Sequence, residues 1–363
     1  MKRLLELNIK RDKDIEYRIE ITDENFSNFV NELVELNKEK KFIIVISKKV
    51  FDLYHEELEL EKFNYIIIKD GEKEKNIKNY IKIINFAIKN HISRNDLFVA
   101  IGGGVIGDLT GFAASTYMRG VEYIQVPTTL LSMVDSSVGG KNGINFDNVK
   151  NIAGTFKQPK KVYININFLN TLDDKQYKSG LGEILKYSFI EDSCPHKTSE
   201  YLFEYLMINY ENVAKKIGKT LFKIIETCLK LKIGVVQEDE KENSLRKILN
   251  LGHTVAHALE TETKYKKYTH GQAVIYGIYV VFDWAYKNNY ISYSYYRLAM
   301  ELMEKYGFKE TSISKKFDTA ELVKIMQSDK KSDGENITFI IPTDKKKVQE
   351  IQLTQDEVLN MLQ

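Results

Sequence analysis

The sequence is poor in cysteine and has no long uninterrupted hydrophobic run. Its 363 residues include two cysteines, Cys194 and Cys228, and no C-x-x-C pair, which excludes a disulfide framework and a cysteine-based redox or metal motif. No stretch approaches the ~18 apolar residues that a membrane-spanning helix requires. The segment Met1–Leu5 is followed by Glu6 and Lys10, so we expect no signal peptide. These absences favour a cytoplasmic protein.

The chain also lacks an excess of charge of either sign. Lys and Arg number 53 and Asp and Glu number 51, for a formal net charge of +2. Without a basic field in either half, there is no reason to expect a nucleic-acid or membrane partner. Hydrophobic residues make up 43% of the chain, so a chain of this length is expected to form two domains, each with its own core.

The first part of the sequence alternates short apolar runs with amphipathic stretches. Residues 76–89, for example, place Ile77, Ile81 and Ile84 on one face of a helix. Strands that alternate with helices predict a mostly parallel sheet, so residues 1–170 are expected to form a Rossmann-like α/β domain that binds a nucleotide. The expected buried strands are Tyr17–Ile21, Phe42–Ser47, Asn64–Ile68, Leu97–Ile101, Val121–Val126 and Val162–Ile166.

The pattern changes near Thr171. From there to the end the sequence is mostly amphipathic helix, with one late pair of strand-like runs at Ile337–Ile341 and Val348–Leu353. Residues 171–363 are therefore expected to form a second, mainly α-helical domain.

Glycine is concentrated in one segment. Ten of the 20 glycines fall between Gly102 and Gly154, and glycine is favoured where the backbone approaches a ligand closely. The strand Leu97–Ile101 runs directly into Gly102, Gly103 and Gly104, and a helix follows. Backbone N–H groups at such a helix start can bind a pyrophosphate. A tight turn with close packing would also select glycine, but three in succession after a buried strand favour a dinucleotide.

A second glycine-containing segment runs from Asp135 to Lys141. It resembles a phosphate-binding loop, but the first glycine of that motif is absent because Asp135 occupies its position. ATP binding is therefore not expected here. A carboxylate and an ammonium beside two glycines suit a polar substrate instead.

Histidines cluster in the second half of the chain. Of six histidines, His253, His257 and His270 lie within 18 residues. His253 and His257 are four residues apart in the expected helix 249–259, so they share one face. Two imidazoles and a carboxylate form a common catalytic Zn²⁺ site that leaves a coordination position open. Spacing leaves the carboxylate undecided between Glu183, which is flanked by glycines, and Glu260.

Several cations are candidates for the same site. Arg246 precedes His253 by seven residues, so both project from one side of a helix if that helix begins early enough. Each cation alone is more often a solvated surface charge. Together with a metal and NAD they suggest oxidation of an alcohol in a phosphorylated, carboxylated substrate. The other candidates are Lys186, Lys232, Lys330 and Lys331.

At this level the chain resembles the 3-dehydroquinate synthases, members of the sugar phosphate cyclases, along nearly its whole length. The resemblance rests on a set of stretches that together are highly specific. They are GGGVIGDLTGFAASTYMRG (102–120), VPTTLLSMVDSSVGGKNGIN (126–145), KNIAGTFKQP (150–159), GLGEILKYS (180–188), RKILNLGHTVAHALE (246–260), HGQAVIYG (270–277) and DKK (329–331).

The resemblance implies a role for each matching residue. Glu183, His253 and His270 would be the metal ligands, with Zn²⁺ as the usual metal and Co²⁺ able to replace it. The residues implied for NAD are Glu72, Lys75, Gly102, Gly103, Gly104, Asp108, Thr128 and Thr129. Those implied for the substrate are Asp135, Lys141, Lys150, Asn151, Lys186, Lys232, Arg246, Asn250 and His257, with Lys330 or Lys331 on the phosphate. The resemblance also implies a homodimer in which Arg119 reaches the neighbouring active site.

The implied reaction makes the protein an NAD- and metal-dependent carbon–oxygen lyase. It would convert 3-deoxy-D-arabino-heptulosonate 7-phosphate, a phosphorylated seven-carbon sugar acid, to 3-dehydroquinate and phosphate. In the family, transient oxidation by NAD allows phosphate to leave by β-elimination. Return of the hydride and an intramolecular aldol step then complete the carbocycle.

The sequence departs from the family near the expected cofactor and metal sites. Ser47, Lys48 and Lys49 stand where the family tends to have Asp or Asn near the adenosine ribose, and Gln272 replaces the usual Glu after His270. The second change is expected to alter the surroundings of the metal ligands.

Three other functions are compatible with parts of the pattern. A polyol dehydrogenase shares the glycine loop but would use an Asp-His-His metal set. Cyclases of sedoheptulose 7-phosphate or glucose 6-phosphate act on substrates without a carboxylate, whereas Lys232, Arg246 and Asn250 favour a carboxylated one. A non-catalytic NAD-binding regulator is the third, but nearly every polar residue expected of the enzyme is present, which argues against it.

Overall fold

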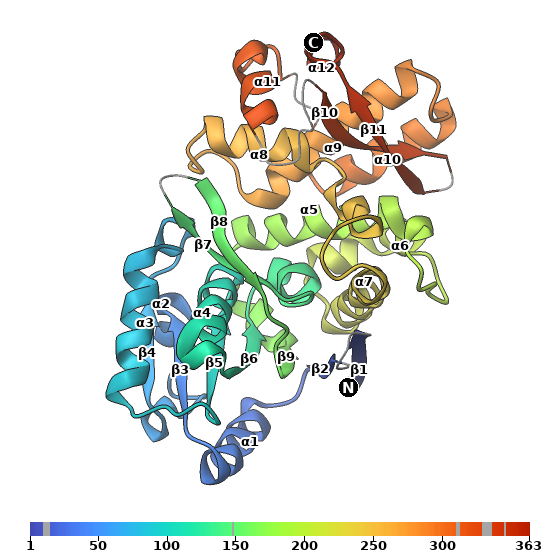
Figure 1. The fold of residues 1–363 in the computed structure, drawn as a ribbon. Helices are drawn as coiled ribbons and strands as arrows, with labels where there is room; N and C mark the ends of the chain where they lie inside the picture. The colour runs from blue at the N-terminus through green and yellow to red at the C-terminus, as the bar shows by residue number, and fades with distance from the viewer. Residues whose placement is uncertain (10–14, 147–148, 310–312, 329–335, 345) are drawn as a thin grey trace. The chain divides into compact units, whose positions relative to one another are not determined.

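The computed structural model describes residues 1–9, 15–146, 149–309, 313–328, 336–344 and 346–363. The chain divides into two units, and Figure 1 shows the elements of each. The first unit comprises Met1–Asp173 together with Leu221–Leu229, and the second comprises Asp174–Thr220 and Lys230–Gln363. The first unit is thus discontinuous in sequence, a feature that no periodicity in the chain indicates.

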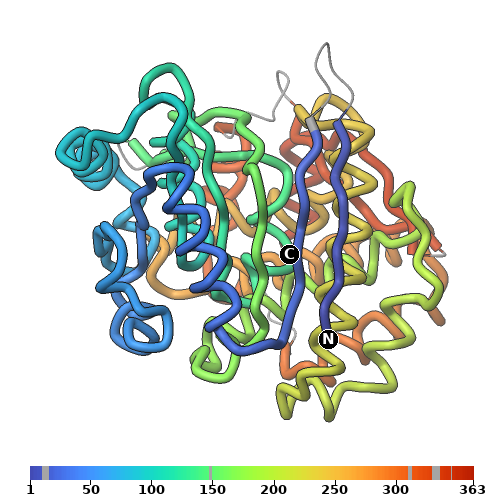
Figure 2. The backbone as a smooth tube through the Cα atoms, turned by 90° about the horizontal axis from the view of Figure 1, so that it is seen from below, coloured from blue at the N-terminus to red at the C-terminus, as the bar shows by residue number. Residues whose placement is uncertain are grey.

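The first unit is built on a seven-stranded sheet in the order β1-β2-β9-β6-β5-β3-β4. All neighbouring strands are parallel except the edge pair β1–β2, which runs as two long strands side by side in Figure 2. This confirms the expected mostly parallel α/β sheet. The strands are β1 (Lys2–Ile9), β2 (Ile15–Thr22), β3 (Phe42–Ser47), β4 (Tyr65–Ile68), β5 (Leu97–Gly102), β6 (Glu122–Pro127) and β9 (Lys161–Asn165).

Both faces of the central strands are buried. Every residue of β3 and β5 is inaccessible to solvent, as continuous apolar runs in parallel strands require. Helices between the strands supply the covering side chains, and α3 and α4 pack against one another on one face. These helices are α1 (Phe26–Glu39), α2 (Lys48–Tyr54), α3 (Ile77–Lys89) and α4 (Gly104–Thr116).

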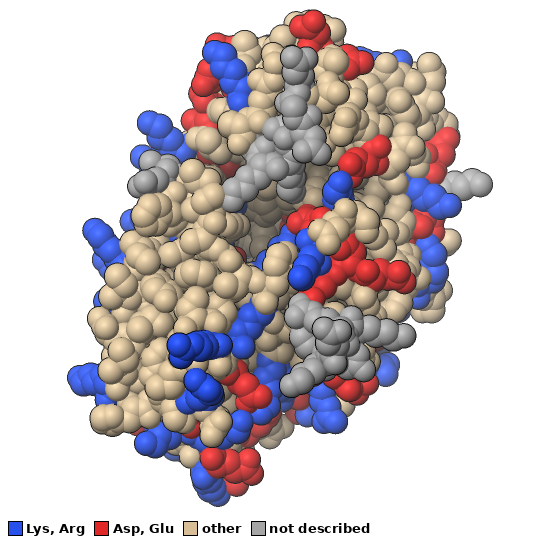
Figure 3. All heavy atoms as spheres, viewed as in Figure 1, with Lys and Arg blue, Asp and Glu red and all other residues tan. Residues whose placement is uncertain are grey.

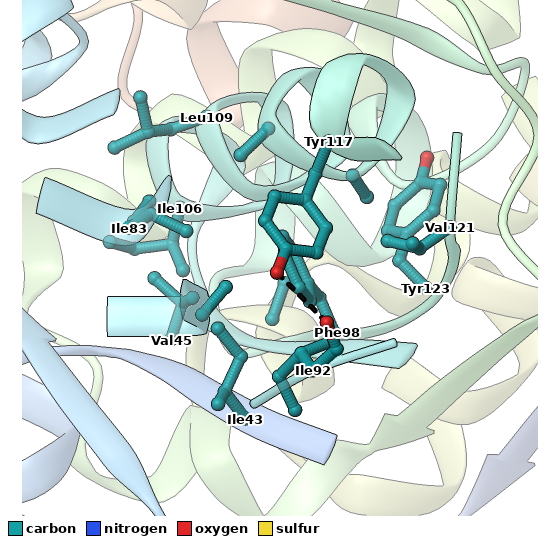
Figure 4. Packing of buried hydrophobic residues seen from close by; sticks show 14 of the residues in the cluster. Ile43, Val45, Ile83, Ile92, Phe98, Ile106, Leu109, Tyr117, Val121 and Tyr123 are labelled. Carbon is teal, nitrogen blue, oxygen red and sulfur yellow. Dashed lines mark hydrogen bonds between the residues drawn. The ribbon is translucent and has the colours of Figure 1, made fainter. Parts of the chain in front are cut away.

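A cluster of buried side chains joins the sheet to α4. Phe98 of β5 packs beside Tyr117, which follows α4, with ring centroids 5.6 Å apart. The Tyr117 hydroxyl donates a hydrogen bond of 2.8 Å to the carbonyl of Ile92 (Figure 4). The phenol therefore fills the core without leaving its polar atom unpaired. The cluster fixes α4, and with it the glycine loop at its start.

A β-hairpin that the periodicity did not predict lies at the end of the glycine-rich segment. Its strands are β7 (Lys141–Phe146) and β8 (Val149–Phe156), paired antiparallel. Gly143 and Gly154 face each other, and a Cβ on Gly143 would lie 2.8 Å from the Ala153 carbonyl oxygen. The glycines thus allow the two strands to approach, and the hairpin carries three of the predicted substrate residues.

The second unit is mainly helical, as expected. One antiparallel strand pair, β10 (Ile337–Thr343) and β11 (Lys347–Leu353), lies near its end, close to the predicted strand-like runs. The helices α8 and α9 pack together, and α5 packs on α9. The helices are α5 (Asp174–Ile190), α6 (Leu202–Ala214), α7 (Gly218–Glu238, shared with the first unit), α8 (His253–Glu262), α9 (His270–Lys287), α10 (Tyr293–Lys305), α11 (Thr319–Ser328) and α12 (Gln355–Met361).

The expected helix 249–259 was placed too early. α8 begins at His253 because Gly252 takes a left-handed conformation, with φ 77°, which interrupts helical backbone. Arg246 lies before this break, in a separate 3-10 turn, Leu245–Asn250. The early helix start on which Arg246 and His253 would project from one helix is therefore not observed.

The described surface agrees with the balanced composition. On the face shown in Figure 3, basic and acidic side chains are interspersed. Among the described residues no helix has both the length and the apolar character needed to cross a membrane.

Candidate active site

Glu183, His253 and His270 come together in the second unit. One ligand atom from each lies within 4.8 Å of the others. Oε1 of Glu183 is 3.7 Å from Nε2 of His253 and 3.5 Å from Nε2 of His270. These distances are too long for strong hydrogen bonds, and the Glu183 side chain is only 1% exposed. A buried carboxylate facing two imidazoles at this separation could hold a divalent cation between them.

The ring nitrogens of the two histidines are oriented for this purpose. Nδ1 of His253 lies 3.2 Å from the carbonyl oxygen of Leu251, and Nδ1 of His270 lies 3.2 Å from Oε1 of Glu260. A carbonyl or ionised carboxylate oxygen can only accept a hydrogen bond. Each Nδ1 can therefore only donate to that oxygen, which leaves each Nε2, facing Glu183, as the nitrogen available to a cation. Metal-binding histidines use this arrangement.

Close contacts at glycine bring the three elements together. Gly182 of α5 and Gly271 of α9 are so close that a Cβ on Gly182 would lie 2.3 Å from the Gly271 carbonyl oxygen. A Cβ on Gly277 of α9 would lie 2.0 Å from the carbonyl oxygen of Gly252. Each candidate ligand is a direct chain neighbour of one of these glycines: Gly182–Glu183, Gly252–His253 and His270–Gly271. The backbones can therefore approach closely enough for short side chains to converge.

The geometry distinguishes the two carboxylates between which spacing could not choose. Glu183 faces the Nε2 atoms of both histidines, whereas Glu260 faces the opposite nitrogen of His270. Gln272, the departure from the family pattern, does not contact the histidines in any interaction found among the described residues. Its Oε1 accepts from the backbone N–H of Thr269 at 3.0 Å and closes a capping box at the start of α9. Gln272 therefore caps the helix whose first residue is His270.

His257 lies beside this group. Its ring centroid is 5.6 Å from that of His253 and 6.4 Å from that of His270. It is one turn along α8, so the ring is near the cation position without belonging to the converging set.

Three predicted cations are deeply buried in the second unit. Lys186 is 1% exposed, Lys232 4% and Arg246 2%. Nζ of Lys186 lies 2.5 Å from Oε2 of Glu183, whereas Oε1 faces the Nε2 atoms of His253 and His270. Buried cations are costly unless they are paired, and Lys186 and Arg246 have partners in Glu183 and the Glu240 carbonyl.

The loop before Arg246 supplies residues that the sequence reasoning missed. Asp239 accepts backbone hydrogen bonds from Ser244 at 2.7 Å and from Arg246 at 3.0 Å, and the Arg246 guanidinium donates to the carbonyl of Glu240. The pKa of Asp239 is lowered: burial opposes the shift, but these N–H donors outweigh it. Asn250 donates to Glu242 at 2.7 Å. The acidic run Glu238–Glu242 before Arg246 was the available signal.

In the first unit, α4 begins at the glycine loop. Its N-cap, Gly103, makes no side-chain capping bond, and the first turn carries no acidic residue. A Cβ on Gly103 would lie 3.0 Å from Thr129, and one on Gly104 would lie 2.9 Å from Ser136. The N-terminal end of α4 therefore has no side-chain cap at Gly103, and Thr129 and Ser136 leave no room for larger residues at Gly103 and Gly104. Both features fit an anionic ligand such as a pyrophosphate.

The residues predicted for NAD around the loop form one hydrogen-bonded group. Nζ of Lys75, which is 3% exposed, lies 2.5 Å from Asp108 and 2.5 Å from Oδ1 of Asn151. The Asn151 N–H donates to Asn145, whose amide donates to Glu72 at 2.9 Å. Burial raises the pKa of Asp108, against the effect of the Lys75 ammonium. Asn145, not predicted as a site residue, links the group to the hairpin.

The two predicted threonines lie at the end of β6. Thr128 donates its N–H to the carbonyl of Gly102 at 3.0 Å, and Thr129 shares a 2.8 Å hydroxyl contact with Ser132. They therefore border the glycine loop, as predicted. Ser47, by contrast, caps α2 by accepting from the N–H of Val50 at 3.2 Å.

The remaining predicted substrate residues lie at ends of elements. Asp135 is in a π-helical turn, Ser132–Ser136, a type of turn that is frequent at functional sites. Lys141 starts β7, and Lys150 is in β8. Arg119 is exposed and has φ 67°. Lys330 and Lys331 lie outside the described residues.

Comparison with known proteins matches most of the chain to one family. Residues 65–179 match a family model described as 3-dehydroquinate synthase N-terminal, and residues 180–332 match one described as 3-dehydroquinate synthase C-terminal. The 3-dehydroquinate synthase of Alkaliphilus metalliredigens is 43% identical over 297 residues, covering 82% of this chain and 81% of that protein. The 3-dehydroquinate synthase of Dictyoglomus thermophilum is 39% identical over 351 residues, covering 96% of both.

A solved structure has the same fold. It is 2-epi-5-epi-valiolone synthase from Streptomyces hygroscopicus with NAD⁺ and Zn²⁺ bound, similar with a TM-score of 0.83 over 98% of each chain. Its sequence is 22% identical, so it supports the architecture of an α/β domain followed by a helical one.

Proposed function

The chain belongs to the 3-dehydroquinate synthase family, and from this premise we propose that it converts 3-deoxy-D-arabino-heptulosonate 7-phosphate to 3-dehydroquinate and phosphate. The observation that carries the proposal is the convergence of Glu183, His253 and His270 in a unit that also buries the cations Lys186, Lys232 and Arg246. A sugar acid phosphate has two anionic ends and an alcohol between them. Buried ammonium and guanidinium groups suit the ends, and a cation site suits the alcohol.

NAD and a divalent metal, Zn²⁺ or Co²⁺, would supply the hydride acceptor and the Lewis acid when bound. In the second unit, Glu183, His253 and His270 would hold the metal, and the Lys186 ammonium would neutralise the Glu183 oxygen that faces away from the histidines. In the first unit, the α4 N-terminus and Gly102–Gly104 would bind the pyrophosphate of NAD. The remaining cofactor residues we propose are Glu72, Lys75, Asp108, Thr128 and Thr129.

The other polar residues would bind and orient the substrate. The planar guanidinium of Arg246 donates a hydrogen bond to the Glu240 carbonyl, which orients it. Such a group suits a carboxylate or phosphate. His257, one turn from His253, is placed to exchange a proton with an oxygen of the bound substrate. The further substrate residues we propose are Asp135, Lys141, Lys150, Asn151, Lys186, Lys232 and Asn250, with Lys330 or Lys331 on the phosphate.

We also propose a homodimer in which Arg119 serves the neighbouring subunit. The 3-10 turn that carries Arg119 also exposes Met118, 46% accessible. The hairpin β7–β8 exposes Phe146, Val149 and Phe156 at 42–51%. Large apolar side chains grouped on one hairpin are typical of an interface, and an interface at this turn would bring Arg119 to a second subunit. The cytoplasm is the compartment we propose for this biosynthetic reaction.

Measuring phosphate and NADH together tests the proposed reaction. A cyclase of this type returns the hydride within each turnover, so phosphate should be released continuously while NADH absorbance stays flat. The protein is incubated with the heptulosonate phosphate, Zn²⁺ and NAD, and both signals are followed. A polyol dehydrogenase would instead form NADH mole for mole and leave phosphate on the product, and that result would refute the proposal. Turnover of sedoheptulose 7-phosphate in preference to the acid would assign the chain to another cyclase activity.

A further inference from the structure

Glu260 is a buried carboxylate whose contact with His270 is not explained by substrate or cofactor binding. We propose that Glu260 is a positioning residue, which accepts a hydrogen bond from the Nδ1–H of His270 and thereby holds Nε2 toward Glu183. The inference rests on the proposed metal site, because it concerns how one ligand of that site is oriented.

The contact has the geometry of a hydrogen bond between two constrained groups. Oε1 of Glu260 lies 3.2 Å from Nδ1 of His270. The Glu260 side chain is 5% exposed and the His270 side chain 27%, so water competes little for the carboxylate. Glu260 follows His253 by seven residues on α8, two turns along the same face. One helix therefore supplies a candidate ligand and the carboxylate that orients another.

The two histidines differ in how they are held. His253 directs Nδ1 to the carbonyl of Leu251, next to the left-handed Gly252, so local backbone orients its ring. His270 is the first residue of α9, and its orienting partner comes from another helix. A carboxylate is also a stronger acceptor than a carbonyl, and it increases the electron density that the imidazole offers at Nε2. His270 should therefore be the ligand that depends most on a side-chain partner.

A purely structural role for Glu260 predicts a different effect of its replacement than a positioning role does. If the carboxylate only fills space between α8 and α9, its replacement lowers stability but leaves the surviving metal site unchanged in affinity and spectrum. If it positions His270, the affinity falls and the coordination geometry changes even where the protein stays folded. Amide oxygen can still accept from Nδ1, so Glu260→Gln should retain part of the effect that Glu260→Ala loses.

The experiment measures metal binding on protein freed of metal by a chelator. Zn²⁺ affinity is obtained by competition with a chromophoric chelator, and coordination from the visible absorption of the Co²⁺ form. Partners of this type contribute about 10- to 100-fold to metal affinity, so Glu260→Ala should bind Zn²⁺ that much more weakly, with an altered Co²⁺ spectrum. Glu260→Gln should lie between Glu260→Ala and the wild type. Glu191→Gln, a change at another buried carboxylate of the same unit (2% exposed), should match the wild type.

Three results would count against the inference, and they are distinguishable. A folded Glu260→Ala protein with wild-type Zn²⁺ affinity and Co²⁺ spectrum shows that Glu260 does not position His270, while the metal site itself stands. If the wild type and Glu183→Ala bind Zn²⁺ equally, the proposed metal site fails and the inference fails with it. Should Glu260→Ala not fold, an unchanged affinity and spectrum in Glu260→Gln would likewise count against the inference.

Discussion

Replacing Gly271 by alanine should disrupt the candidate metal site through the backbone. An added Cβ would lie 1.8 Å from the carbonyl oxygen of Ser179 in α5, and contacts under 3.0 Å are essentially never seen. The start of α9 must therefore move from α5 by about 1.2 Å. Gly182 packs on the same backbone, so the shift separates Glu183 from Nε2 of His270, now 3.5 Å away.

The size of this movement sets the expected loss. Metal–ligand distances are defined to about 0.2 Å, so a displacement of about 1.2 Å cannot be absorbed without losing one ligand or straining the fold. Overpacking of this kind costs about 1–3 kcal/mol of stability. We expect thermal unfolding at lower temperature and Zn²⁺ affinity lowered about tenfold or more, measured by chelator competition as above.

A matched glycine in the other unit separates the two effects. Gly111 is also helical, in α4, and a Cβ there would lie 1.9 Å from Oδ1 of Asn142. Gly111→Ala should lower stability, to a lesser degree because a side chain can move more easily than a backbone carbonyl, but should leave Zn²⁺ affinity unchanged. If Gly271→Ala has the same unfolding temperature and the same Zn²⁺ affinity as the wild type, the argument from the close approach of α5 and α9 is wrong.

Three further outcomes are expected. Alanine at Glu183 should abolish both metal retention and turnover, measured by metal analysis and phosphate release; retention of full metal and rate would refute its assignment as a ligand. Mixing inactive Arg119→Ala with inactive Lys141→Ala should restore activity through mixed dimers; no recovery despite proven subunit exchange would count against a shared site. Burial raises the pKa of Glu191 from 4.5 to about 7, against the N–H groups of Leu202 and Phe203 that it caps. Because the carboxyl pKa is higher in the folded state, the folded protein keeps this proton to a higher pH than the unfolded chain does. As the pH rises from about 4.5 to about 7, the free energy of unfolding therefore falls by on the order of 3 kcal/mol. Chemical unfolding across this range should show that slope in the wild type and lose it in Glu191→Gln; an equal slope in both would contradict the assignment.

The parallel sheet could be predicted because its strands are continuous apolar runs. β3 and β5 are buried on both faces, so nearly every side chain in them is Ile, Val, Leu, Phe or Ala. β1 was missed for the opposite reason. It is an edge strand in which Leu5, Leu7 and Ile9 alternate with exposed polar residues while the residues before Leu5 are exposed, so it contains no continuous apolar run.

The hairpin β7–β8 and the start of α8 depend on interactions that no local pattern contains. The hairpin sequences, KNGINF and VKNIAGTF, are polar and rich in glycine, and their register is set by backbone approach at Gly143 and Gly154. Likewise, residues 245–259 have helical periodicity throughout. The break at Gly252 comes from its close contact with Val274 and Ile278 of α9, which lie more than 20 residues away in sequence.

The candidate metal site combines both kinds of information. The histidine cluster was visible in the sequence, but choosing between Glu183 and Glu260 required the direction of each ring nitrogen. One local signal did distinguish the carboxylate that faces both Nε2 atoms. Glu183 follows a glycine that lets α5 touch α9, whereas Glu260 is flanked by Leu259 and Thr261. Side chains of two or three carbons converge on one ion only where their backbones approach closely, so a glycine beside a candidate ligand indicates a helix crossing at the site. Glu260 needs no such approach, because it contacts Nδ1 of His270, and the imidazole ring lies between its carboxylate and the candidate ion position.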